Sequence, residues 1–358
     1  MTLTHIIPQT QIDEVAALLH KASKVVITCH MTPDGDALGS SLGLANVLRS
    51  RGFKACVIVP DTPPKALQFL PGATEVVIAS RYTDRARSLL HTAELVFCLD
   101  YNALKRIDRL APLVEESTAP RVMIDHHLDP EEFADVMISH PESSSTCSLL
   151  YHLLDALGWA SSISCEAATC IYAGMLTDTG NFSYNSNDPD LYLIIARLLK
   201  RGLDKDAVFN KVMNTNRPNR LRVCGYALAD KMQLLWEHHA SVIVLTREEL
   251  TEFGYIKGDT EGLVNRPLSI PGIVYSIFIR QDDDGYVKIS MRSTGDFPVN
   301  TICEELFAGG GHLNAAGGEY HGPLDEAVDK IINALPSYDR FLPDEYKDGD
   351  DNLNLETN

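Results

Sequence analysis

Acidic and histidine side chains directly follow three apolar segments of the chain. The segments are 24–29, 95–99 and 122–124, and the polar residues after them are His30, Asp34, Asp36, Asp100, Asp125, His126 and His127. Carboxylates that crowd together raise one another's pKa and repel unless cations lie between them. If the three segments are neighbouring parallel strands, these groups meet at one edge of a sheet and predict a metal site.

The first half of the chain alternates between strand-like and helix-like patterns. Expected strands cover 25–29, 55–59, 76–78, 95–99 and 121–124, and expected helices cover 36–49, 64–69, 83–91 and 103–110. Strands that alternate with helices indicate a parallel α/β sheet covered on both faces. Ligands of such sheets bind at the carboxyl ends of the strands, which is where the acids and histidines fall.

The rest of the chain is organised differently. Helices are expected over 146–154, 166–177, 190–201, 205–213 and 219–235, followed by strands at 240–245, 274–279 and 287–291 and helices at 302–307 and 324–335. The chain is therefore predicted to be an α/β protein. It would have a parallel-sheet N-terminal domain (1–215), a linker helix (216–236), a smaller α/β domain (237–338) and a mobile acidic tail (339–358).

The composition limits the possible partners. The net charge is −18, from 31 basic and 49 acidic residues, whereas surfaces that bind long nucleic acids are usually basic. We therefore expect no long-duplex ligand. No apolar run reaches about 18 residues, so no membrane span is expected, and the N-terminus lacks the pattern of a secretion signal. The eight cysteines form no C-x-x-C pair, which is typical of reduced thiols in a cytoplasmic protein.

Taken one at a time, the acidic motifs have simpler interpretations. Pro33-Asp34-Gly35 can be only a turn, and Asp100 can be the N-cap of a helix. Asp178 ends an expected helix, where a carboxylate opposes the helix dipole unless a cation compensates it.

Taken together, the motifs have the charge of a two-metal site. Two divalent cations would balance the four carboxylates of Asp34, Asp36, Asp100 and Asp178, and His30 and His126 would add neutral nitrogen ligands. Oxygen and imidazole ligands without a thiolate suit Mn²⁺ better than structural Zn²⁺. A carboxylate that bridges two such ions would hold them about 3.5–4 Å apart, the spacing used to hydrolyse phosphate esters.

Two features of the second domain suit an anion. The run Gly309-Gly310-Gly311-His312 offers successive backbone N–H groups that can surround a phosphate, although flexible loops often contain such a run. Arg292, followed by Ser293, comes at the end of an expected strand. Its planar guanidinium is well suited to a phosphate, but an exposed arginine at a strand end is the simpler interpretation.

With these residues in place, the sequence resembles the DHH superfamily of phosphoesterases. The family's four catalytic motifs match H-M-T-P-D-G-D-A at 30–37, Leu99-Asp100, Asp125-His126-His127 and Thr177-Asp178-Thr179-Gly180. The segments 261–265, 291–293 and 309–312 resemble the DHH-associated second domain. The compact two-domain layout is similar to the nanoRNase/pAp-phosphatase branch, which also contains cyclic-di-AMP phosphodiesterases.

The resemblance implies a role for each site residue. His30 and Asp34 would bind the first Mn²⁺, with Mg²⁺ as the alternative ion, and Asp36, His126 and Asp178 the second. Asp100 would bridge both ions. Asp125 would support the site, and His127 would contact the scissile phosphate or protonate the leaving oxygen. The second domain would hold another part of the substrate through Arg292, Ser293, Gly309, Gly310, Gly311 and His312.

The implied function is hydrolysis of short oligoribonucleotides, pApA-like dinucleotides or pAp by a water that two metal ions activate. Closure of the two domains would bring Arg292 and His312 over the metals. Alternatives are a cyclic-di-AMP phosphodiesterase, an exopolyphosphatase- or pyrophosphatase-like phosphohydrolase, and a nucleotide-binding regulator with a degenerate site. Relatives often pair, so a homodimer is expected.

Overall fold

A computed structural model describes residues 2–282 and 285–346. The chain divides into two compact units, with the boundary between Thr215 and Asn216, and each is described by itself. Within the described residues, no helix is both long enough and apolar enough to cross a bilayer.

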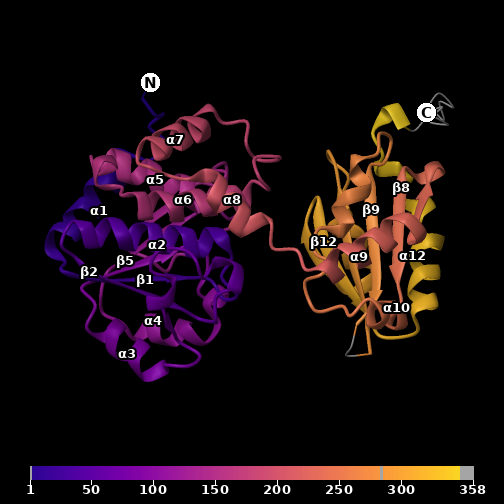
Figure 1. Ribbon diagram of the computed structural model, residues 1–358, viewed down its shortest axis with the longest axis horizontal. Coiled ribbons are helices and arrows are strands. Elements are labelled where there is room, and N and C mark those ends of the chain that lie inside the picture. The colour runs from indigo at the N-terminus through magenta and orange to yellow at the C-terminus, as the bar shows by residue number, and fades with distance from the viewer. Residues whose placement is uncertain (1, 283–284, 347–358) are drawn as a thin grey trace. The chain divides into compact units, whose positions relative to one another are not determined.

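The first unit contains a six-stranded parallel sheet (Figure 1). Its strands are β1 (Lys24–Cys29), β2 (Lys54–Val59), β3 (Val77–Ile78), β4 (Leu95–Leu99), β5 (Arg121–Asp125) and β6 (Val136–Ser139), in the order β3-β2-β1-β4-β5-β6. Every neighbouring pair is parallel. The central strands β1 and β4 are mostly apolar, and apart from Lys24 they are buried along their length, because both faces of the sheet are covered. The predicted α/β fold class is confirmed.

Helices cover both faces of this sheet (Figure 1). One face carries α1 (Gln9–Lys21), α2 (Gly35–Ser50), α5 (Thr146–Ala156), α6 (Cys165–Asp178), α7 (Pro189–Lys200) and α8 (Lys205–Met213). The other face carries α3 (Thr83–His91) and α4 (Ala111–Glu116). Alternate residues of β1 divide between the two cores, with Val25 and Ile27 in one and Val26 in the other.

The strand order places a topological switch point between β1 and β4. The chain builds outward from β1 through β2 to β3, and then returns to the other side of β1 as β4. Connections on the two sides of such a point leave in opposite directions and open a crevice at the carboxyl ends of the strands. The loops after β1, β4 and β5 therefore meet at this edge.

The second unit contains a mixed sheet of six strands. They are β7 (Met232–Leu235), β8 (Ala240–Leu245), β9 (Tyr275–Gln281), β10 (Val287–Ser293), β11 (Gly310–His312) and β12 (Ala315–Tyr320), in the order β11-β12-β10-β9-β8-β7. Only β8 and β9 pair in parallel. Helices α11 (Val299–Phe307) and α12 (Leu324–Tyr338) cover one face. Helix α9 (Pro218–Tyr226) and the short α10 (Arg247–Glu252) contribute to a separate apolar cluster on the other.

Some elements differ from the sequence predictions. The single helix expected over 219–235 is wrong in its last part, because α9 gives way to a π-helical turn (Ala227–Lys231) and then to β7, which pairs with β8. Helix α1 and strands β6, β11 and β12 were not predicted. Of the expected acidic tail, residues 339–346 form two 3₁₀ turns with Leu342 buried, and 347–358 lie outside the described residues.

Candidate metal centre

The loops after the central strands, together with α2 and α6, bring six predicted ligands together in two groups. One group is His30, Asp34 and Asp100, and the other is Asp36, His126 and Asp178. Within each group, one ligand atom per residue lies within 4.8 Å of the others. Asp100 also joins a third group with His126 and His127. The sheet edge therefore holds two potential cation sites, with Asp100 next to both.

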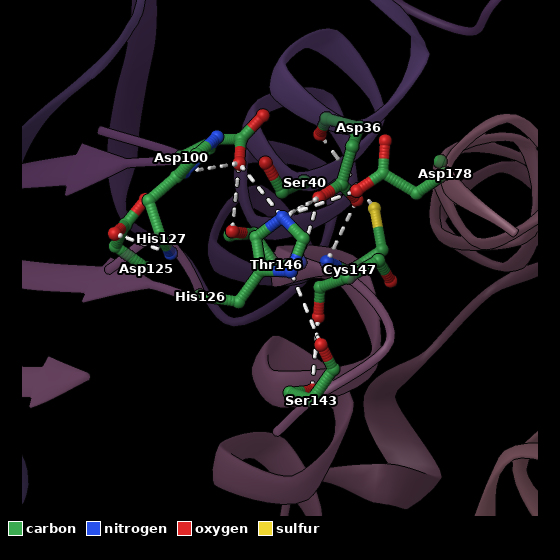
Figure 2. Close-up of polar contacts among 12 residues, drawn as sticks. Asp36, Ser40, Asp100, Asp125, His126, His127, Ser143, Thr146, Cys147 and Asp178 are labelled. Atoms are coloured by element: carbon green, nitrogen blue, oxygen red, sulfur yellow. Dashed lines mark hydrogen bonds and ion pairs between the residues drawn. The ribbon is translucent and has the colours of Figure 1, made fainter. Parts of the chain in front are cut away.

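The imidazole Nε2 atoms face the carboxylates. His30 Nε2 lies 3.4 Å from Asp100 Oδ2 and 3.6 Å from Asp34 Oδ1. His126 Nε2 lies 3.1 Å from Asp178 Oδ2, 3.7 Å from Asp100 Oδ1 and 3.9 Å from Asp36 Oδ2. Figure 2 shows the His126 ring between these three aspartates, which come from the loop after β4 and from two different helices.

Backbone carbonyls orient both rings. His30 Nδ1 lies 2.7 Å from the carbonyl oxygen of Met31, and His126 Nδ1 lies 3.1 Å from that of Ser143. A carbonyl can only accept, so each Nδ1 carries the proton and donates it. In the neutral ring, Nε2 then presents its lone pair to the carboxylate cluster. Metal-binding histidines are held in the same way by hydrogen bonds from their second nitrogen.

The N-terminus of α5 supports the most deeply buried aspartate. Asp36 has no exposed surface, and its carboxylate accepts hydrogen bonds from Thr146 N (2.6 Å) and Cys147 N (2.9 Å). The Thr146 hydroxyl donates to Asp100 Oδ1 at 2.9 Å. Free N–H groups and the positive end of the helix dipole stabilise a carboxylate there. The Ser145 side chain caps this helix by accepting from Ser148 N, and the supporting role of Thr146 and Cys147 was not predicted.

The cluster lacks basic partners other than histidine. In the parts of the chain that the structure describes, the four aspartates form ion pairs only with His30, His126 and His127. Burial, with the charges of Asp178 and Asp100, raises the pKa of Asp36 well above its usual range. Burial opposes protonation of His126, but its aspartate neighbours raise the pKa of the ring to about 10. Such a cluster attracts positive charge strongly.

The donor set fits divalent cations. It consists of carboxylate oxygens and two oriented imidazole nitrogens, without a thiolate among the groups that the structure brings together. These are ligands for ions such as Mn²⁺. Two divalent cations would neutralise the four carboxylates, of which Asp36 and Asp100 are buried.

Asp100 has an unusual backbone conformation. Its φ is 64°, in the left-handed region, and its N–H donates to the Ile124 carbonyl at 3.0 Å. Aspartate tolerates this region better than most residues, although the conformation still costs free energy. Such strain is concentrated at functional sites. The turn places the Asp100 carboxylate directly after β4, and Asp100 is only 2% exposed.

Asp125 fixes the second histidine of the pair. His127 Nδ1 and its backbone N both lie 2.8 Å from the oxygens of Asp125, which is fully buried at the end of β5. The carboxylate therefore holds a proton on His127 Nδ1, and Nε2 is left for another partner. Figure 2 shows the His127 ring next to Asp125 and the His126 ring next to Asp178, so the adjacent histidines have different partners.

Glycines allow α2 and α6 to approach closely. A Cβ at Gly39 would lie 2.5 Å from the Cys170 carbonyl oxygen, and one at Gly174 would lie 2.7 Å from Asp36 Oδ1. Side chains at these positions would hold the two helices apart. Asp36 begins α2 and Asp178 ends α6, so the glycines let ligands from two helices share one cluster.

The predicted substrate residues of the second unit lie on β10, on β11 and next to them. Arg292 Nη1 donates to the Met291 carbonyl at 2.8 Å, and the Ser293 hydroxyl donates to the Phe297 carbonyl at 2.6 Å. The glycine run is mostly strand, with Gly310–His312 paired to β12. A Cβ at Gly309 would overlap the Gly317 carbonyl oxygen, so close strand packing is one reason for glycine there.

The fold and the site together define a class of protein. A doubly wound sheet whose switch point holds buried aspartates and oriented histidines is suited to divalent cations and to the hydrolysis of phosphate esters.

The comparison with known families is more specific. Residues 24–175 match the DHH family, N-terminal domain, and residues 239–338 match the DHHA1 domain. The chain is 32% identical over 314 residues to the bifunctional oligoribonuclease and PAP phosphatase NrnA of Thermus thermophilus, over 87% of this chain and 89% of that protein. The chain therefore belongs to the DHH family and is a phosphoester hydrolase.

Two solved structures are similar to the chain. The crystal structure of an exopolyphosphatase-related protein from Bacteroides fragilis matches with a TM-score of 0.90 and 47% identity, covering 94% of this chain and 99% of that one. RecJ of Thermus thermophilus in complex with Mn²⁺ matches with a TM-score of 0.50 and 17% identity. It covers 96% of this chain and 56% of RecJ, and it shows a shared fold.

Proposed function

We propose that the chain is a divalent-metal-dependent phosphodiesterase that hydrolyses short oligoribonucleotides, pApA-like dinucleotides and pAp, with Mn²⁺ as its ion. The observation that carries the proposal is the pair of carboxylate–imidazole groups at the switch point, with Asp100 next to both. The similarity to an oligoribonuclease and PAP phosphatase supports this choice of substrates. RecJ of Thermus thermophilus, which shares the fold and was solved in complex with Mn²⁺, supports this choice of ion.

The proposed roles follow from the two groups. His30 and Asp34 would hold one ion, Asp36, His126 and Asp178 would hold the other, and Asp100, which lies next to both His30 and His126, would contribute to both. When bound, the ions supply positive charge for the phosphoryl oxygens and lower the pKa of a water. The protein keeps the ligands in place through α5 and the two backbone carbonyls.

His127 is proposed to act on the substrate itself. Because Asp125 holds the proton on Nδ1, Nε2 is the nitrogen that can contact the scissile phosphate. In its protonated form it can give a proton to the leaving oxygen.

The second unit is proposed to bind the part of the substrate that does not react. Arg292 and the run Gly309–His312 offer a guanidinium, backbone N–H groups and an imidazole, which suit a terminal phosphate. Replacing Arg292 with Ala should then raise KM much more than it lowers kcat. We also propose a homodimer in the cytoplasm, which light scattering and cell fractionation would test.

A substrate panel tests the proposal. Purified protein with Mn²⁺, with Mg²⁺ and with a chelator is given pAp, pApA, RNA of two to five nucleotides, cyclic-di-AMP and polyphosphate. Release of mononucleotides from the short RNAs, or of phosphate from pAp, only with metal is the expected result. The similarity to an exopolyphosphatase-related protein makes polyphosphate the second candidate. Hydrolysis of polyphosphate without activity on dinucleotides would replace the first proposal.

A matched pair of variants tests the site. Asp100→Asn removes a charge but keeps a residue that tolerates left-handed backbone. Asp108→Asn does the same at φ 42°, on a side chain that is 64% exposed. Loss of turnover in the first variant alone supports the proposed role of Asp100. Equal activity in both would remove Asp100 from the mechanism.

A further inference from the structure

Large apolar side chains are exposed close to the carboxylate cluster. Met31 follows His30, and Leu128 follows His127, and both are more than 40% exposed. Tyr184, in the loop after α6, is 56% exposed. Single exposed apolar residues are common on protein surfaces. Three such residues that lie within six positions of predicted metal ligands suggest a binding surface.

The ring of Tyr184 lies against the backbone beside Asp178. A Cβ at Gly180 would lie 2.6 Å from Cζ of Tyr184, so the ring occupies the space that a side chain at Gly180 would fill. Gly180 is two residues beyond Asp178, and its Cα is at most about 7.6 Å from that of Asp178. The aromatic ring therefore lies against the turn after α6, two residues beyond Asp178.

The loop that carries Tyr184 is held in a costly conformation. Asn181, Phe182 and Asn185 all have φ between 46° and 61°, which is unusual for a bulky residue such as phenylalanine. Hydrogen bonds from Ser183 N (2.8 Å) and Tyr184 N (3.2 Å) to the Thr179 carbonyl maintain the turn. Conformations of this kind are typical of functional loops.

Packing anchors the same loop. The Phe182 ring lies 5.9 Å from the ring of Tyr172 and 6.4 Å from that of Tyr192, measured between centroids. Phe182 thus points into the unit, while Tyr184 keeps more than half of its surface exposed.

The two other apolar residues also sit on tethered loops. Met31 N donates to the Arg106 carbonyl at 2.8 Å. The side-chain amide of Asn102 donates to the Leu128 carbonyl. These contacts tether the backbone of the loops after β1 and β5 to the segment after β4.

We propose that Tyr184 stacks on a nucleobase of the substrate while Met31 and Leu128 make apolar contacts beside the cluster. The inference rests on the proposed function, since it requires a phosphate ester of a nucleoside. Every nucleobase has a flat face that an aromatic ring can stack on, so this contact selects nucleotides without selecting a sequence. Polyphosphate and pyrophosphate have no apolar part, and they gain nothing from these side chains.

Variants at Tyr184 test the stacking contact. We expect Tyr184→Ala to lower kcat/KM for pApA by about fivefold to a hundredfold, and Tyr184→Phe to stay close to the wild-type value. The effect should largely vanish for a dinucleotide whose base has been removed at the position next to the scissile phosphate. Tyr82→Ala is the matched control, because Tyr82 is 58% exposed and precedes α3. It should behave as wild type.

Binding measurements separate stacking from a structural role. In calorimetry with the Mn²⁺-loaded protein, Tyr184→Ala should bind AMP more weakly, but inorganic phosphate and Mn²⁺ itself as well as the wild type does. Equal losses for AMP, phosphate and Mn²⁺ would show that the loop merely supports the site, and would overturn the inference. Wild-type-like kinetics of Tyr184→Ala on pApA would also overturn it and leave the proposed function intact. A wild-type protein inactive on every nucleotide would instead refute the proposed function.

Discussion

Replacing Gly174 with Ala should show how helix packing sets the geometry of the site. Glycine inside a helix usually costs about 0.5–1 kcal/mol relative to alanine, so this substitution would stabilise an isolated helix. In the folded protein, the new Cβ would overlap Cys147 Sγ and lie 2.7 Å from Asp36 Oδ1 and 2.9 Å from Asp36 Cα. Carbon and oxygen atoms need several tenths of an ångström more than this.

The packing effect should be larger than the helix effect. Asp36 and Cys147 are fully buried, and Asp36 is held by two backbone N–H groups, so neither can move away freely. Overpacking of a buried site costs about 1–3 kcal/mol. After subtracting the helix gain, we expect the free energy of unfolding to fall by about 0.5–2 kcal/mol. Displacement of Asp36 should weaken Mn²⁺ binding about tenfold to a hundredfold, as changes beside metal ligands usually do.

Two assays measure these effects. Guanidinium unfolding of the metal-free protein gives the stability, and calorimetric titration gives the Mn²⁺ affinity. Gly225→Ala in α9 is the matched control, since no atom lies within 4 Å of its added Cβ and its backbone is not left-handed. This control should be neutral or slightly stabilising. If Gly174→Ala were stabilised to the same degree and bound Mn²⁺ normally, the packing argument would be refuted.

Three further predictions follow from single contacts. Asp100→Asn should abolish measurable binding of at least one Mn²⁺ in calorimetry while the circular dichroism spectrum stays that of the folded protein; two intact sites would contradict a shared role. Thr146→Val removes the hydroxyl that donates to Asp100, and should lower Mn²⁺ affinity or kcat/KM about tenfold to a hundredfold; unchanged values would show that the backbone alone orients the carboxylate. Burial raises the pKa of Glu249, but hydrogen bonds from Lys231, Tyr226 and the Thr246 backbone outweigh burial and lower this pKa to about 2. The carboxylate therefore stabilises the second unit fully above its unfolded pKa near 4.5, and this contribution is lost as the pH falls toward 2. Glu249→Gln should lower the unfolding free energy at pH 7 by about 1–3 kcal/mol and flatten its dependence on pH between 4.5 and 2; an unchanged acid limb in urea unfolding would exclude this contribution.

The regular elements of the first unit were predictable because their patterns are local. The central strands are short runs of Val, Ile, Leu and Cys, and α2 begins after an aspartate whose side chain caps it. Strand β6 was missed because it has only four residues and lies at the edge of the sheet. The end of the helix predicted at 219–235 was wrong because Met232–Leu235 pairs with β8. Such pairing is a tertiary effect that overrides helical periodicity.

The glycine run shows a different limit. Its composition suggested an open loop that binds anions, but the structure pairs Gly310–His312 with β12 and brings Gly309 close to the Gly317 backbone. The absence of a side chain at Gly309 allows the backbones to pack closely, and it would also leave the backbone N–H groups accessible to an anion. A run of identical residues cannot distinguish these reasons, since both depend on the absence of a side chain.

The sequence by itself indicated which residues could form a cation site in this protein. Acids and histidines that follow several buried strands indicate a cation site, because strand ends of a parallel sheet converge and crowded carboxylates need cations. Only the tertiary structure decided how these groups are held. The support that α5 gives to Asp36 and the Ser143 carbonyl that orients His126 join residues that are 110 and 17 positions apart in the sequence. Local patterns do not encode such contacts, because they form only when the strands and helices pack.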